Sequence, residues 1–236
     1  MQEEDQNQQP RPAMITSPEW CVLDEFEFDF VEANSQHFRF QPGEAVFHEG
    51  DIVKGTYFLE SGMVAVRKSD PKGQATLLKL AQPGDTLGYR PLIANECHRA
   101  SAEAMEESDV YLINKSAVRE LVASNPALGL SFLKRAAKEL GIAEEKFHES
   151  VTLSMRARFA HLLLSLKEKW GQQQEDGTLH LALPVSRSDL AEMLGVRRES
   201  LSRLIHDLQT SDVAHFYHRM VIIPKPDDLL AIFRRD

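Results

Sequence analysis

The chain has 236 residues and a mass of 26.7 kDa, enough for one or two domains with a full hydrophobic core. Hydrophobic residues make up 42% and charged residues 27%, and no apolar run approaches the ~18 residues of a membrane-spanning helix, which excludes that class. The net charge is −9, but residues 154–236 carry 12 basic and 11 acidic side chains, so the acidic excess lies in residues 1–153. The negative net charge therefore does not exclude DNA binding by the C-terminal part, because affinity for DNA depends on local phosphate contacts.

The first 20 residues are polar and contain Pro10, Pro12 and Pro18, which predicts a flexible tail over residues 1–20. They lack the basic-then-apolar order of a signal peptide, so we expect a cytoplasmic protein. Only two cysteines are present, Cys21 and Cys97. They are too few for a disulfide framework or a four-cysteine site, which agrees with a reducing compartment.

Residues 21–125 carry a β signal from about His37 onwards. Apolar and polar residues alternate in short runs, as at Phe38 and Phe40 or at Val64 and Val66. Glycines punctuate these runs at intervals of 12, 11 and 11 residues: Gly50, Gly62, Gly73 and Gly84. Short strands at this spacing predict a sandwich, barrel or jelly roll.

In residues 126–153 the apolar residues recur with the period of a helix. Apolar residues recur at steps of three and four along one long helix: Leu133, Ala136, Leu140, Ala143, Phe147 and Val151. Such a seam serves either a helix that lies on its own domain or the interface of a dimer. We favour the dimer interface, because small alanines let two helices approach closely. A second helix is predicted over 154–170, followed by a polar loop over 171–177.

Residues 186–208 read SRSDLAEMLGVRRESLSRLIHDL, a helix–turn–helix pattern. Ser186 and Asp189 form a capping pair, Gly195 supplies the turn, and Leu201 and Leu208 face inward. The apolar runs of residues 212–224 predict a β-hairpin wing beside the two helices. A plain αα-hairpin of a helical protein is the alternative interpretation.

The second helix of this pair presents a polar face near its N-terminus, the part of a recognition helix that reaches base edges. Arginine pairs with guanine, and glutamate accepts from cytosine. The residues predicted to contact bases are Arg198, Glu199, Ser202 and Arg203. Those predicted to contact phosphates are Ser186, Arg187, Ser188 and Arg197.

Four segments carry a family resemblance: FQPGEAVFHEGD at 40–51, SGMVAVRK at 61–68, PGDTLGY at 83–89 and SRSDLAEMLGVRRESLSR at 186–203. In this order they resemble the Crp–Fnr superfamily of bacterial transcription regulators. The resemblance implies an α+β fold with three parts: a jelly-roll sensor (a double-stranded β-helix) over 21–125, a dimerisation helix over 126–153 and a winged helix–turn–helix over 154–236. It further implies a homodimer that binds palindromic double-stranded DNA and contacts RNA polymerase.

The recognition helix satisfies two patterns of this family. Glu199, Ser202 and Arg203 match the fumarate–nitrate type, whose half-site has a TTGA core. Arg198, Glu199 and Arg203 match the cyclic-AMP receptor type, whose core resembles TGTGA. Ser202 favours the first.

The residues that would form an effector pocket by this resemblance depart from the cyclic-AMP type. Gly88 is followed by Tyr89 in place of the ribose-binding acid, Arg99 is followed by Ala100, and the dimer-helix pair is Ala143 and Glu144. These changes argue against cyclic AMP, because a site built on hydrogen bonds loses heavily when they are removed. Arg99 is expected to be buried and either to hold another anion or to pair with a carboxylate.

No cofactor is predicted. Two cysteines argue against the four-cysteine iron–sulfur cluster of the fumarate–nitrate type. Haem binding is not excluded by the sequence. Four histidines lie in or near the sensor, but none has the spacing that marks an axial ligand: His37, His48, His98 and His148. Whether Cys21 or Cys97 is redox-active also stays open.

Two other functions compete with DNA binding. The chain could be a small-molecule-binding regulatory module that uses its C-terminal helices for protein contact. An enzyme would need a site such as Cys97 and His98, but neighbours on a strand point to opposite faces, and the common catalytic motifs are absent. We therefore expect a DNA-binding regulator, controlled by an unidentified effector or constitutively active.

Overall fold

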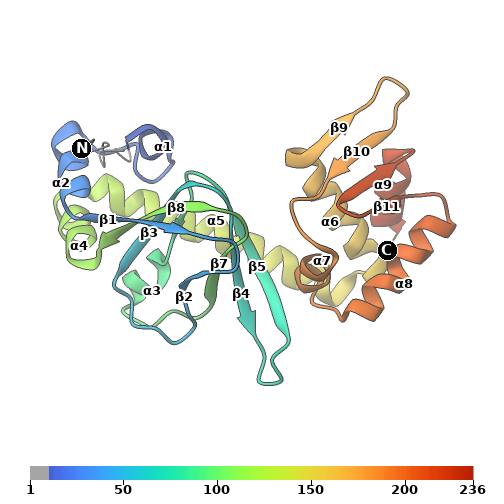
Figure 1. The fold of residues 1–236 in the computed structure, drawn as a ribbon, viewed down its shortest axis with the longest axis horizontal. Coiled ribbons are helices and arrows are strands. Elements are labelled where there is room, and N and C mark those ends of the chain that lie inside the picture. The colour runs from blue at the N-terminus through green and yellow to red at the C-terminus, as the bar shows by residue number, and fades with distance from the viewer. Residues whose placement is uncertain (1–10, 236) are drawn as a thin grey trace, which may run out of the picture. The chain divides into compact units, whose positions relative to one another are not determined.

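The computed structural model describes residues 11–235, which divide into two compact units (Figure 1). The first holds the described residues up to 74 together with 78–140, and the second holds 75–77 and the residues from 141 onwards. Each unit is described by itself. None of the helices within residues 11–235 combines the length and the apolar character that a membrane span requires.

The first unit is built on two antiparallel four-stranded sheets, in the orders β1-β8-β3-β6 and β2-β7-β4-β5. The β domain predicted from the sequence is thus confirmed. The strands are β1 (Ser35–Phe40), β2 (Ala45–Phe47), β3 (Gly55–Ser61), β4 (Val64–Ser69), β5 (Ala75–Ala81), β6 (Thr86–Leu87), β7 (Ser101–Ala104) and β8 (Ser108–Asn114).

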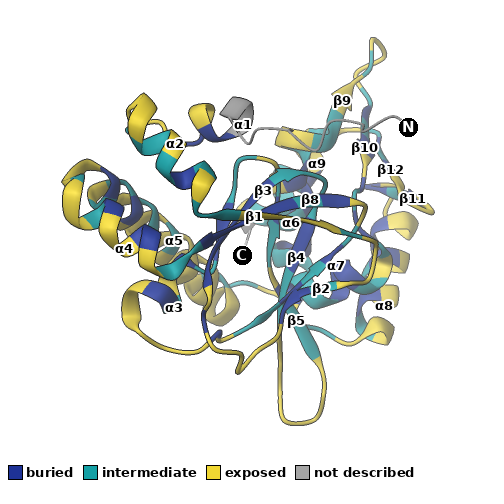
Figure 2. Ribbon diagram, turned by 60° about the vertical axis from the view of Figure 1, so that its left-hand side comes forward, coloured by how far each residue is buried: buried dark blue, intermediate teal, exposed yellow. Residues whose placement is uncertain are grey.

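The surroundings of the β3–β8 pair explain one of the regularly spaced glycines, Gly62. In the β3–β8 pair Phe58 lies opposite Tyr111, and Figure 2 shows much of both strands as buried. Gly62 follows β3 with φ of +85°, and a Cβ atom there would collide with the backbone of Glu107 and Ser108. A residue with a side chain would therefore force the chain apart at this turn.

The N-terminal segment corrects a prediction. Residues 1–20 were expected to form a flexible tail, but the structure places helix α1 (Arg11–Thr16) here and buries Met14 and Trp20 almost completely. Residues 1–10 lie outside the described part. Proline and polar residues misled the prediction, because burial of Trp20 depends on residues far along the chain.

Helices complete the first unit. Helix α2 (Glu25–Ala33) begins with a capping box formed by Asp24 and Glu27. Helices α3 (Tyr89–Ala94) and α4 (Lys115–Ser124) follow β6 and β8. The predicted long helix is α5 (Pro126–Thr152), whose first turns bury Leu128 and Phe132 in the core.

The second unit combines helices with one antiparallel sheet. Its helices are α6 (Met155–Trp170), α7 (Arg187–Leu194), α8 (Arg198–Thr210) and α9 (Pro226–Arg235). Its sheet has the order β11-β12-β10-β9, formed by β11 (His215–Tyr217), β12 (Met220–Ile223), β10 (Leu179–Ala182) and β9 (Gly171–Gln173). The segment 171–177 was predicted to be a loop, but its first three residues pair with β10. The two paired strands are separated by only a few residues of sequence, but the polar glutamines of β9 give no strand signal.

Candidate nucleic-acid interface

Helix α7 begins at the capping pair that the sequence indicates. The Ser186 Oγ atom donates to Asp189 Oδ2 over 2.6 Å and accepts from the Asp189 backbone N–H over 3.2 Å. The carboxylate of Asp189, a buried residue, also accepts a hydrogen bond from the Ser186 backbone N–H over 2.8 Å. The helix ends at Gly195, whose φ of +67° is the left-handed conformation of a helix C-cap. The Ser186 hydroxyl proton is thus used inside the protein, although the residue was predicted to contact phosphate.

Helix α8 follows after a three-residue turn, Gly195 to Arg197. Leu201, Ile205 and Leu208 face the interior, as their spacing predicts. Its opposite face is exposed (Figure 2) and carries all four residues predicted to contact bases: Arg198, Glu199, Ser202 and Arg203. The structure therefore brings these side chains together on one side of one helix.

Two hydrogen bonds tie the predicted phosphate-contacting residues to this helix and to the wing. The Arg198 Nε atom donates to Ser188 Oγ over 3.0 Å, which joins the first turn of α8 to the first turn of α7. The Arg187 guanidinium donates to the Phe216 carbonyl of β11 over 3.4 Å. Arg197 is exposed at the start of α8. The predicted wing is the hairpin of β11 and β12, in which Phe216 lies opposite Val221.

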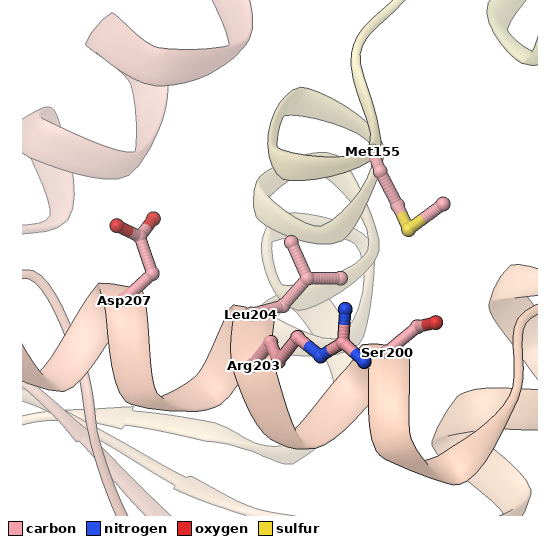
Figure 3. Close-up of a pocket in the computed structure, with 5 residues that line it drawn as sticks. All are labelled: Met155, Ser200, Arg203, Leu204 and Asp207. Atoms are coloured by element: carbon pink, nitrogen blue, oxygen red, sulfur yellow. The ribbon is translucent and has the colours of Figure 1, made fainter.

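A hollow of about 340 Å³ lies beside this face, lined by Met155, Ser200, Arg203, Leu204 and Asp207 (Figure 3). Met155 comes from the start of α6 and the other four residues come from α8. Nearby, the Arg156 Nε atom lies 3.2 Å from Asp207 Oδ2, which fastens α6 to the recognition helix. Met155, Arg156 and Asp207 are not among the predicted site residues, because no local sequence signal indicates that residues some 50 positions apart meet.

Of the predicted effector residues, Arg99 pairs with a carboxylate, which was one of its two expected roles, but it is not buried. Arg99 was expected to be buried, but its side chain is 75% exposed and pairs with Glu96 over 2.7 Å. The reason is the short connection from α3 to β7, which runs over the surface and leaves Arg99 beside the nearest carboxylate. Gly88 has a φ of +76°, and Tyr89 is buried. Ala100 is half-buried next to Arg99.

Tyr89 belongs to a cluster of ionic side chains centred on Arg135 of α5. The Tyr89 hydroxyl donates to Glu139 over 2.9 Å, and the Arg135 guanidinium contacts Asp85 over 2.8 Å and Glu139 over 3.3 Å. Lys79 lies 3.0 Å from Asp85 and 3.5 Å from Glu139. We call these five residues the Arg135 cluster.

The charges of the Arg135 cluster compensate one another. Burial by itself raises the pKa of Asp85 and of Glu139, but Lys79 and Arg135 overcome this effect and hold both pKa values below their usual range. Burial and the Glu139 carboxylate raise the pKa of Tyr89 well above its ordinary value, so its hydroxyl remains a donor. Each charged side chain of the cluster therefore has a partner of opposite charge within the first unit.

Cys97 and His98 do not form a catalytic pair. Cys97 is exposed, whereas His98 is buried and its ring stacks on Phe47 with centroids 3.9 Å apart. Burial lowers the pKa of His98, which the nearby Asp51 carboxylate partly opposes. Within residues 11–235 no group of three or more His, Cys, Asp or Glu side chains is placed to hold a metal ion.

The predicted dimer seam lies on an exposed part of α5. Leu133 and Leu140 are exposed by 64% and 60%, and Phe147 and Val151 are also exposed. Ala143 and Glu144 are exposed as well, whereas Ala136 packs partly against the core. Core packing thus uses Leu128 and Phe132, and it leaves most of the seam free.

Comparison with protein families matches both units. The cyclic nucleotide-binding domain model matches residues 37–125, and the Crp-like helix-turn-helix domain model matches residues 157–232. The chain belongs to the Crp–Fnr superfamily of transcription regulators. Its helix–turn–helix domain is a DNA-binding domain, and the family consists of regulators and not of enzymes.

Individual proteins that are similar to this regulator along most of its length are themselves named as regulators. The anaerobic regulatory protein of Bacillus subtilis (strain 168) is 25% identical over 187 residues, which cover 79% of this chain and 78% of that protein. A CRP-like cAMP-activated global transcriptional regulator of Mycobacterium tuberculosis is 25% identical over 168 residues, covering 71% and 75%. The solved structure of FixK2 from Bradyrhizobium japonicum has a TM-score of 0.71 at 23% identity, covers 84% of this chain and 96% of that chain, and shows the shared fold.

A cyclic nucleotide does not fit the residues of this regulator that stand at the family's binding turn. Tyr89 fills the turn with a buried side chain that is hydrogen-bonded to Glu139. Arg99, the one candidate partner for a phosphate there, faces solvent and is paired with Glu96. The Tyr89 hydroxyl and the Arg99 guanidinium are thus already paired with carboxylates of the protein.

Proposed function

We propose that this regulator acts as a homodimer that pairs through the seam of α5 and binds two-fold symmetric DNA. Each subunit inserts α8, over residues 197–208, into a major groove, and the two half-sites lie about one helical turn apart. RNA polymerase is the proposed partner at the promoter. The observation that carries the proposal is the exposed face of α8, where Arg198, Glu199, Ser202 and Arg203 stand together.

The contacts of these side chains support a division of roles. Arg203 and Glu199 have no competing bond to α7, so they are free to meet base edges as donor and acceptor. Arg198 is drawn toward Ser188 by a hydrogen bond of 3.0 Å. The Ser202 hydroxyl donates to the Arg198 carbonyl over 2.9 Å, so it meets a base as an acceptor. We favour the half-site with a TTGA core, which uses Glu199, Ser202 and Arg203, over the TGTGA core, which needs the side chain of Arg198.

Phosphate contacts hold the protein on the duplex. Arg187, Ser188 and Arg197 lie around the start of α7 and α8, where helix N-termini favour an anion. Ser186 contributes by capping α7 rather than through its hydroxyl proton. These residues position the recognition helix but do not read the sequence.

The test compares Arg203→Ala with Arg197→Ala on symmetric duplexes that carry TTGA half-sites or single base changes, by fluorescence anisotropy at stated salt concentrations. Arg203→Ala should cost ~1–3 kcal/mol on the preferred duplex and relax the preference at one position. Arg197→Ala should weaken all duplexes alike and reduce the salt slope by about 1.

Equal loss on every duplex for Arg203→Ala would contradict base reading by this residue. A wild-type protein that prefers no duplex at any salt concentration would instead support the alternative, a regulatory module whose C-terminal helices contact protein.

A further inference from the structure

The segment of residues 14–23, which we call the strap, is fastened to the β-roll of the first unit. The Trp20 Nε1 atom donates to Thr86 Oγ1 over 2.8 Å, and both residues are buried. The Ser17 hydroxyl lies within hydrogen-bond distance of the Gly84 carbonyl, at 3.1 Å. The accepting atoms thus lie in the turn before β6 and in β6 itself, which directly precede Gly88 and Tyr89.

The strap also contacts α5. Glu19 Oε1 lies 2.8 Å from Arg135 Nη1, and the side chains are only 4% and 11% exposed. The rings of Trp20 and Phe132 meet edge to face with centroids 5.5 Å apart. Glu19 thereby adds a third carboxylate to the Arg135 cluster, beside Asp85 and Glu139.

These contacts fix the rotation of α5 about its own axis. Phe132, Arg135 and Glu139 follow one another at helical spacing and share the face that the β-roll and the strap hold. Leu133 and Leu140 of the seam are exposed on a different face of the same helix. A helix whose inner face is held by buried charges and rings presents its seam in one orientation, which lowers the ordering cost of dimerisation.

We propose that the strap is a built-in brace that takes the place of a small-molecule effector, so that the regulator dimerises and binds DNA without an added ligand. The proposal rests on dimeric DNA binding as the function. Two observations support it. The strap lies outside residues 37–125 and 157–232, the parts that the family models match. The Tyr89 hydroxyl, at the turn where the family binds its ligand, already donates to Glu139.

The experiment measures two quantities on full-length protein freed of small molecules by unfolding and refolding. The first is the dimer dissociation constant by sedimentation equilibrium, and the second is affinity for the TTGA duplex with and without cyclic AMP. Glu19→Lys places a like charge against Arg135. Glu106→Lys, in an exposed turn, is the matched control because it changes the net charge equally.

We expect ligand-free wild-type protein and Glu106→Lys to dimerise and to bind the duplex equally well, with no change on adding cyclic AMP. Glu19→Lys should raise the dimer dissociation constant roughly tenfold or more, because a buried ion pair is broken. Glu19→Gln, which keeps the shape of the side chain, should weaken dimerisation in the same direction by less.

A folded Glu19→Lys protein with the wild-type dimer dissociation constant would overturn the proposal. So would wild-type protein that binds the duplex only after cyclic AMP is added. If Glu19→Lys does not fold, unchanged dimerisation of Glu19→Gln is the overturning result. Absence of any DNA binding by wild-type protein would refute the proposed function instead, while the dimer measurements would still decide the role of the strap.

Discussion

Replacement of Leu140 by alanine tests the dimer seam. The Leu140 side chain is 60% exposed in the single chain. Complete burial of a leucine is worth about 1.5–3 kcal/mol, so burial of this remaining part is worth about 1–2 kcal/mol per copy. A symmetric dimer contains two copies, which gives about 2–4 kcal/mol in total. Leu140→Ala should therefore raise the dimer dissociation constant roughly 30- to 700-fold.

The assay is sedimentation equilibrium over a series of protein concentrations, followed by DNA titration at each concentration. Affinity for DNA should fall at low protein concentration and recover at high concentration, because mass action restores the dimer. Ile142→Ala is the matched control. Ile142 is 49% exposed on the same helix, but two positions turn it about 200° away from Leu140.

Equal dissociation constants for Leu140→Ala and Ile142→Ala would refute the seam, whatever their common value. A loss of DNA affinity that high protein concentration does not restore would show that Leu140 acts on DNA binding by another route than pairing.

Three further predictions concern stability. Gly141→Ala should raise the midpoint of thermal unfolding, with a gain of ~1 kcal/mol in helix propensity, because a Cβ atom there meets nothing within 4 Å; no gain would mean that α5 is not a rigid helix at this point. Ser186→Ala should cost ~1 kcal/mol in denaturant unfolding, because it removes the cap of α7, and intact stability with weakened DNA binding would show a phosphate contact instead. The stabilisation from Asp85 and Glu139 should be complete above about pH 5 and should be lost as the pH falls through their lowered folded-state pKa values. Acid titration by near-ultraviolet circular dichroism checks this, and Asp85→Asn should flatten the curve.

The recognition helices were predictable because their signals are local. The Ser186 cap, the Gly195 turn and the inward residues of α8 each depend on neighbours within one or two helical turns. The same holds for the β domain, where alternation and glycine turns identify strands, although they do not give the sheet order.

The strap and the effector turn were beyond the reach of local signals. Trp20 is buried because Thr86 and Phe132 surround it, and Glu19 is buried because Arg135 supplies its charge. By itself, a polar, proline-containing segment indicates a tail, and Arg99 in its motif indicates an anion site.

The sequence by itself determined the two kinds of domain and the exposed polar face of α8, since periodicity and caps are properties of nearby residues; the dimer seam stays a prediction. Only the tertiary structure decided that Tyr89 bonds to Glu139 and that Glu19 and Trp20 of the strap contact Arg135 and Phe132 of α5. Those outcomes depend on charges and rings that meet across 50 to more than 100 residues of chain, and no local pattern encodes which partner a buried charge will find.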